Sequence, residues 1–196
     1  MKLKVGCNAV SRDIKRVEAV RNAVGGDFIL ACDANRAWTV DQALEFARSV
    51  ADLDLACLEE PVRWHNEVDG MSRVRSSGLV PVNACQCEIC GSGCTNLMKA
   101  EAVDYLNLDA SIAGGITEWK RIAIAASFYG VGMVHHEEPQ VSIHLLSAIP
   151  HGYCAELFHD PVRDPVRHQM CLDHPEPKNG HISPADRPGL GYPNRP

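Results

Sequence analysis

Short apolar runs alternate with segments of helical spacing along most of this chain. The apolar runs end at Gly, Pro or charged residues and predict strands. They cover residues 2–7, 28–33, 55–60, 80–85, 105–109, 132–136 and 153–158. Between them, the spacing of apolar residues predicts helices over 11–24, 39–52, 67–76, 95–102, 117–129 and 140–148. Strands that alternate with helices at intervals of roughly 20 to 29 residues indicate a parallel (β/α) TIM-type barrel.

An ionisable residue stands in the middle or at the carboxyl end of each predicted strand, or just beyond that end. In chain order these residues are Lys4, Asp33, Glu59 with Glu60, Glu88, Asp109, His136 and Glu156. At any single position, a charge is equally well explained as the point where a strand leaves the core. Together they favour a functional rim, because (β/α) barrels carry their chemistry at the carboxyl ends of the strands.

The residue types on this rim suggest a particular chemistry. Asp33, Glu59 and Glu88 are hard oxygen ligands that suit an octahedral Mg²⁺ with positions open for substrate. Lys4 precedes them in strand order, and His136 with Asp109 follows. A carboxylate bound to one imidazole nitrogen supports the other as a proton acceptor, and a nearby dication lowers the pKa of a lysine. Two bases beside a metal-bound carboxylate suit removal of the α proton.

Composition narrows the class of protein. A net charge of −6 argues against binding to nucleic acid or to an anionic membrane surface, and leaves small anionic substrates open. The weakly polar run 122–134 is too short to span a bilayer, and the N-terminus lacks a signal-peptide core, so we expect a cytoplasmic location. The nine cysteines are odd in number and mostly lie in apolar runs, which disfavours a disulfide framework.

Four cysteines lie at the end of the fourth predicted strand and just after it. Cys85, Cys87, Cys90 and Cys94 resemble a thiolate cluster for zinc or iron–sulfur, although their spacing is not a common zinc pattern. We favour coincidental small residues over a soft-metal site. Of the adjacent histidines His135 and His136, only one can face the barrel mouth, and alternation alone leaves open which one.

Several short motifs, in order and spacing, resemble the barrel of the enolase superfamily, mandelate racemase subgroup. They are Lys2-Leu3-Lys4, Asp33-Ala34-Asn35, Glu59-Glu60-Pro61, Gln86-Cys87-Glu88, Asp109, His136 and Glu156. The resemblance runs from about residue 2 to residue 158, and residues 179–191 resemble the family's C-terminal segment. In this resemblance, Cys85 stands where a glycine is expected.

The resemblance implies a role for each matched residue. Asp33, Glu59 and Glu88 would hold Mg²⁺, with Asn35 near the metal or substrate. Lys2 would contact the substrate carboxylate and lower the pKa of the neighbouring lysine.

The same resemblance supplies the acid/base groups. Lys4 would be one acid/base, and His136 with Asp109 the other. By the same resemblance, His135 is expected to be packed or to support the site residues from behind. Glu156 would donate a hydrogen bond to the substrate carboxylate. The implied reaction is a carbon–oxygen lyase reaction, the dehydration of a sugar acid through an enediolate. Alternatives are a racemase or epimerase of a hydroxy acid, or a non-catalytic subunit that needs a partner chain. Intact family members are expected to be homo-oligomers.

The chain begins at the Lys-x-Lys strand. We therefore expect a truncated barrel that lacks the family's first strand and its N-terminal capping domain. The expected division is a partial barrel over residues 1–160 and a loop-rich tail over 161–196 that packs back on the barrel or cap. Because the capping domain selects the substrate in this family, the sequence does not specify which sugar acid binds.

Overall fold

A computed structural model describes residues 1–63, 67–158, 160–162, 165–170 and 173–193. Within them, all neighbouring strands are parallel and form one sheet in chain order, as predicted. The strands are β1 (Lys2–Lys4), β2 (Ala31–Asp33), β3 (Leu58–Glu59), β4 (Val82–Ala84), β5 (Tyr105–Asn107), β6 (Gly132–His135) and β7 (Gly152–Ala155). Each is shorter than predicted, because its apolar run continues beyond the paired residues.

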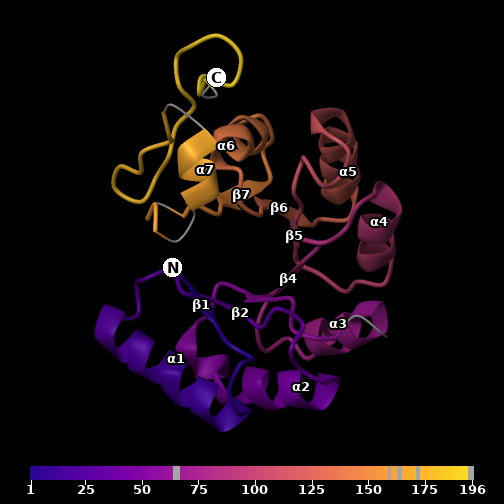
Figure 1. Ribbon diagram of the computed structural model, residues 1–196. Coiled ribbons are helices and arrows are strands. Elements are labelled where there is room, and N and C mark those ends of the chain that lie inside the picture. Colours follow the sequence, from indigo (N-terminus) through magenta and orange to yellow (C-terminus); the bar gives the residue numbers. More distant parts are fainter. Residues whose placement is uncertain (64–66, 159, 163–164, 171–172, 194–196) are drawn as a thin grey trace.

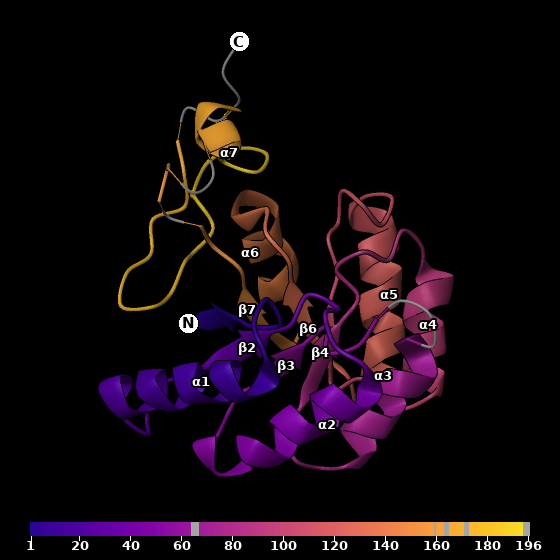
Figure 2. The same cartoon turned by 60° about the horizontal axis from the view of Figure 1, so that its bottom comes forward.

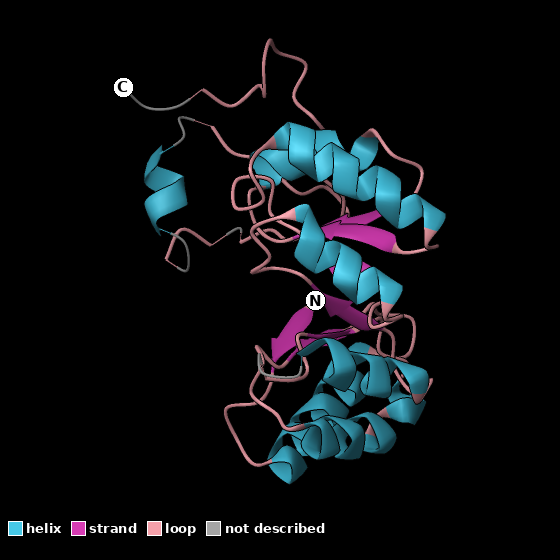
Figure 3. Cartoon of the chain, turned by 90° about the vertical axis from the view of Figure 1, so that its right-hand side faces the viewer, coloured by secondary structure: helices cyan, strands magenta, loops and turns pink. Residues whose placement is uncertain are grey.

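The helices lie on the outside of the curved sheet (Figures 1 and 2). They are α1 (Val10–Val24), α2 (Val40–Ser49), α3 (Glu67–Ser76), α4 (Gly91–Lys99), α5 (Ile116–Phe128), α6 (Pro139–Ser147) and α7 (Pro165–Met170), with a short 3-10 helix at Ala51–Leu53. Figure 3 shows α7 beside the tail, apart from the helices that cover the strands. No helix in the described ranges is long and apolar enough to cross a membrane.

The structure differs from the sequence prediction at two helices, α4 and α7. The helix α4 begins at Gly91, four residues before the predicted start at Thr95. Its first turn contains Gly91 and Gly93, and glycine has a low helix propensity. The helix nevertheless forms there, because Cys94, Leu97 and Met98 pack into the core and stabilise it. The helix α7 falls in the predicted loop-rich tail.

Alternation along the strands separates an apolar outer face from a polar inner one. Leu58, Leu106 and Met133 are fully buried members of the core. Their neighbours along each strand point to the opposite face, where Lys4, Asp33 and Glu59 share one row of the ladder. The row continues with Asn83, Tyr105 and Gly132. The sheet thus directs apolar side chains toward the helices and ionisable ones toward its concave side.

The sheet is open between its two outer strands. In the part of the chain that the structure describes, β1 pairs with β2 and β7 pairs with β6, so these two strands are the sheet edges. On β7, Tyr153 and Cys154 are exposed. The tail contacts the barrel where His144 Nε2 of α6 lies 3.0 Å from the carbonyl oxygen of Leu190. The division at residue 160 stays a prediction.

A buried arginine, Arg21, connects α1 by hydrogen bonds to two other segments in the amino-terminal part of the fold. Arg21 of α1 is 8% exposed and donates to the carbonyl oxygens of Leu53 and Asp54, beside the 3-10 helix. It also donates to the carbonyls of Gly25 and Phe28, in the connection to β2. One guanidinium therefore satisfies carbonyls from two separate loops.

We expect Arg21→Ala to lower the free energy of unfolding by about 2–3 kcal/mol, because buried carbonyls lose charge-assisted hydrogen bonds. Arg12→Ala is the matched control, since Arg12 is an exposed residue of the same helix, and should change stability by less than about 0.5 kcal/mol. Urea unfolding followed by circular dichroism measures both. Equal effects of the two substitutions would contradict this role of Arg21.

Candidate active site

The two lysines of β1 bind carboxylates from the next two strands. Lys4 Nζ forms an ion pair with Asp33. Lys2 Nζ donates to both oxygens of Glu59, at 2.8 and 3.0 Å, and lies 3.8 Å from Asp33 Oδ2. Asp33 and Glu59 are 0% and 1% exposed. The structure therefore brings together four of the predicted site residues, two on β1 and one at the carboxyl end of each of β2 and β3.

Glu156 extends this group across the open edge of the sheet. One carboxylate oxygen lies 2.8 Å from Lys2 Nζ, and the other lies 3.6 Å from His136 Nε2. His136 Nδ1 is 2.8 Å from Asp109 Oδ2, which gives the predicted imidazole–carboxylate pair. A continuous series of polar contacts thus runs from Lys4 to Asp109 and includes both predicted acid/base groups.

Burial and charge shift the pKa values of this network. Burial alone would lower the pKa of Lys2, but the Glu59 and Glu156 carboxylates raise it. Burial raises the pKa of Glu59; Lys2 opposes this shift, and the nearby Asp33 adds to it. Burial would lower the pKa of His136, yet its bond to Asp109 and the Asp109 charge raise it. The carboxylates thus favour the charged forms of Lys2 and His136, whereas burial favours the protonated form of Glu59.

This donor set fits a divalent cation. Asp33 Oδ1 accepts the Asn35 N–H at 2.8 Å, and Glu59 Oε2 accepts from Asn83 Nδ2 at 2.9 Å, so both carboxylates are held in place. Oxygen donors of this kind suit Mg²⁺. Asn83 was not identified from the sequence, although its place in the ladder row of Glu59 could have indicated it.

Among the described residues, Glu88 forms no group with Asp33 and Glu59 whose ligand atoms all lie within 4.8 Å of one another. Its carboxylate lies over Gly93, where an added Cβ would overlap it. Burial raises its pKa, and the charges that act on it belong to Arg36 and Glu60. Gln86 lies nearer to Asp33 along the hydrogen-bond network, because its Nε2 donates to Asn35 Oδ1 at 3.0 Å. The buried Gln86 Oε1 has no hydrogen-bond partner among the described residues.

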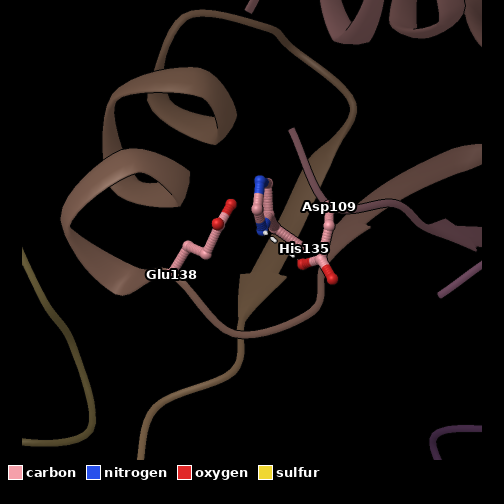
Figure 4. A group of neighbouring side chains, drawn as sticks. All are labelled: Asp109, His135 and Glu138. Carbon is pink, nitrogen blue, oxygen red and sulfur yellow. Dashed lines mark ion pairs between the residues drawn. The ribbon is translucent and has the colours of Figure 1, made fainter. Parts of the chain in front are cut away.

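A second group of possible ligands surrounds His135 (Figure 4). Ligand atoms of Asp109, His135 and Glu138 lie within 4.8 Å of one another. Both imidazole nitrogens of His135 are already engaged, however: Nδ1 is 2.9 Å from the His136 carbonyl oxygen, and Nε2 accepts the Ala110 N–H at 3.2 Å. Burial lowers the pKa of His135. His135 is therefore a packed, neutral residue, as predicted, and not a metal ligand.

The loop after β6 brings a further carboxylate to the site. Glu137 and Glu138 have left-handed backbone angles, with φ of 50° and 48°. Glu137 Oε1 lies 3.9 Å from His136 Nε2, and together with Glu156 these side chains form another group with ligand atoms within 4.8 Å. The sequence did not distinguish this contact from a solvated loop, because the tight turn depends on backbone angles unusual for glutamate.

Comparison with known proteins agrees with this geometry. The pattern of the family described as "Enolase C-terminal domain-like" matches residues 1–194, and the chain belongs to this family. It is 29% identical to the arabinonate dehydratase of Saccharolobus solfataricus over 98% of this chain and 52% of the relative.

Two solved structures extend the comparison. One is a mandelate racemase/muconate lactonizing enzyme from a marine actinobacterium in complex with magnesium, with a TM-score of 0.92 and 46% identity over 99% of this chain and 54% of that one. The other is L-talarate dehydratase from Polaromonas sp. JS666 complexed with Mg and L-glucarate, with a TM-score of 0.91 and 29% identity over 100% of this chain and 53% of that one. The chain spans about half the length of these relatives.

We expect Asp109→Asn to lower the pKa of His136, because the imidazolium loses its carboxylate partner. A raised pKa in the folded chain means that protonated His136 contributes stability. This contribution is fully present below the unfolded pKa of about 6.5 and is lost as pH rises through the folded pKa. NMR titration of the His136 ring measures the shift, and Glu137→Gln serves as a control with a weaker contact. An unchanged His136 pKa in Asp109→Asn would refute the pairing.

Proposed function

We propose that this chain forms the barrel part of a Mg²⁺-dependent enzyme that removes the proton α to a carboxylate, and that the reaction is the dehydration of a sugar acid. The observation that carries the proposal is the contact series from Lys4 through Asp33, Lys2, Glu59 and Glu156 to His136 and Asp109. In this series, the proposed proton-transfer groups Lys4 and His136 lie on either side of the buried carboxylates of Asp33 and Glu59. Similarity to an arabinonate dehydratase and to an L-talarate dehydratase supports dehydration.

Asp33, Glu59 and Glu88 are the proposed Mg²⁺ ligands. When bound, Mg²⁺ would supply positive charge that attracts the substrate carboxylate and makes the α proton more acidic. To bind the same ion as the other two ligands, Glu88 would have to move from its place over Gly93. A carboxylate is a stronger ligand for Mg²⁺ than a carboxamide, which favours Glu88 over the nearer Gln86.

The side chains at each end of the series handle protons. Asp109 engages His136 at Nδ1, so Nε2 is the nitrogen that accepts a proton. Lys4 is the second proton-transfer group. Dehydration needs a base that takes the α proton and an acid that gives a proton to the departing β-hydroxyl, which leaves as water. Lys2, Asn35 and Glu156 are the proposed substrate-binding and orienting groups.

We expect Mg²⁺ to stabilise the chain by about 2.7 kcal/mol at a concentration about 100 times Kd. Asp33→Asn should abolish the stabilisation, because a buried ligand is lost. Thermal unfolding with and without Mg²⁺ provides the measurement. A folded wild-type chain whose unfolding is insensitive to Mg²⁺ would overturn the metal site.

A matched pair of variants identifies the third ligand. Glu88→Gln should weaken Mg²⁺ binding at least tenfold in isothermal titration calorimetry, while Gln86→Leu should leave the affinity within about threefold, since the loss of one charged ligand costs about 1.4 kcal/mol or more. The reverse result would assign the third oxygen to Gln86, whose Oε1 is buried and unpaired among the described groups.

The catalytic proposal predicts hydrogen exchange. With Mg²⁺ in D₂O, the α hydrogen of L-glucarate or a related sugar acid should exchange with solvent deuterium, and a dehydrated keto acid should accumulate. Lys4→Ala and His136→Asn should each stop exchange from one face of the α carbon, as followed by proton NMR. Exchange that persists unchanged in both variants would exclude these residues as bases.

A second candidate function is that of a subunit that works only with a partner chain. The open edge between β1 and β7, with Tyr153 and Cys154 exposed, favours this alternative. A chain that binds Mg²⁺ normally but catalyses neither exchange nor dehydration would support the partner-dependent subunit. Racemase or epimerase activity would appear in the same assay as exchange without loss of water.

A further inference from the structure

Two buried cysteines, one at the start of the loop after β4 and one inside α4, meet across that loop. Cys85 follows the last residue of β4, and Cys94 lies on the buried side of α4. Both are 0% exposed, and their Sγ atoms are 2.7 Å apart. This contact is close, although it is longer than a covalent S–S bond of about 2.05 Å. The other two cysteines of the segment, Cys87 and Cys90, are exposed.

The backbone at Cys85 holds its thiol in this position. Its φ is 105°, a conformation that residues other than glycine rarely adopt and that costs on the order of 1–3 kcal/mol. The Cys85 N–H donates to Glu60 Oε1 at 2.9 Å, and the Gln86 N–H donates to the same oxygen at 3.2 Å. Glu60 thereby fixes the start of the loop, and the strained turn directs Sγ toward α4.

We propose that Cys85 and Cys94 are an oxidation site, at which a hydroperoxide joins them in a disulfide. One thiol attacks the peroxide, the O–O bond breaks, and a sulfenic acid and one water form when the oxidant is hydrogen peroxide. The second thiol then attacks the sulfenic sulfur, the S–O bond breaks, and a second water leaves. Two thiols lose two electrons and two protons in total, and both electrons reduce the peroxide.

The disulfide would close a ring over residues 85–94. This ring contains Gln86 and Glu88, the two residues that compete for the role of third metal ligand. A small thiol such as dithiothreitol would reopen it by thiol–disulfide exchange. Formation of the disulfide involves only the Cys85 and Cys94 sulfur atoms. Its test is therefore independent of whether the chain binds Mg²⁺ or is catalytically active.

The test uses Cys87→Ser/Cys90→Ser, which leaves Cys85 and Cys94 as the thiols of the tryptic peptide 76–99. The reduced protein is treated with hydrogen peroxide, denatured, alkylated with iodoacetamide and digested. We expect a peptide that carries no alkyl group and has lost two hydrogen atoms. Reduction before alkylation should restore two alkylated cysteines. The thermal midpoint should rise on oxidation and fall again on reduction, because the ring restricts the unfolded chain.

Cys85→Ser/Cys94→Ser is the matched control, with the same number of thiols removed, and its thermal midpoint should not rise on peroxide treatment. If either double variant fails to fold, fragment ions of peptide 76–99 from the unsubstituted chain locate the link directly. The proposal is overturned if peroxide leaves Cys85 and Cys94 alkylatable, adds oxygen to them without a link, or joins either one to Cys87 or Cys90 instead.

Discussion

The charge balance around Lys2 is the constraint on which the candidate site depends. Its ammonium group contacts carboxylates from β2, β3 and the segment after β7, namely Asp33, Glu59 and Glu156. Buried carboxylates without a cation are costly, and desolvation strengthens the attraction between those that are paired. Lys2 therefore forms ion pairs with carboxylates on both sides of the open edge, from β2 and β3 on one side and from the segment after β7 on the other. A dication at Asp33 and Glu59 would take over part of this role and release the ammonium group toward an anionic substrate.

The dipeptide His135-His136 shows how one strand separates packing from chemistry. Alternation turns His135 into the core, where its ring lies 6.1 Å from that of Trp119 and both nitrogens are engaged. His136 turns toward the concave side, to Asp109 and Glu156. Burial lowers the pKa of His135, whereas carboxylates raise that of His136. The pKa values of two identical side chains are thus shifted in opposite directions. The shift at His136 depends on Asp109, just after β5, and on Glu156, just after β7.

The sequence predicted those strands and helices whose apolar residues recur at a regular spacing. The strand order and most helices follow from apolar periodicity, whereas the pairing of His136 with Asp109 follows from residues at strand ends together with the family resemblance. The loop from Cys85 to Cys90 follows no such period. The strand ends at Ala84, and the positive φ of Cys85 then turns the chain, so Cys85 and Cys87 do not share a face as they would in a continued strand. The position of Glu88 depends on this turn and was therefore not predictable from alternation.

The adjacent residues Glu59 and Glu60 connect that loop to the site. Glu59 faces Lys2, whereas Glu60 adopts a left-handed conformation with φ of 44° and pairs with Arg36 at 2.8 Å. Because Glu60 also accepts the N–H groups of Cys85 and Gln86, it ties the loop after β2 to the loop after β4. The backbone at the start of the Glu88 loop is thus held by Glu60. Both the proposed metal ligand Glu88 and the thiol of Cys85 therefore depend on Glu60, a buried residue outside the proposed metal and acid/base sets.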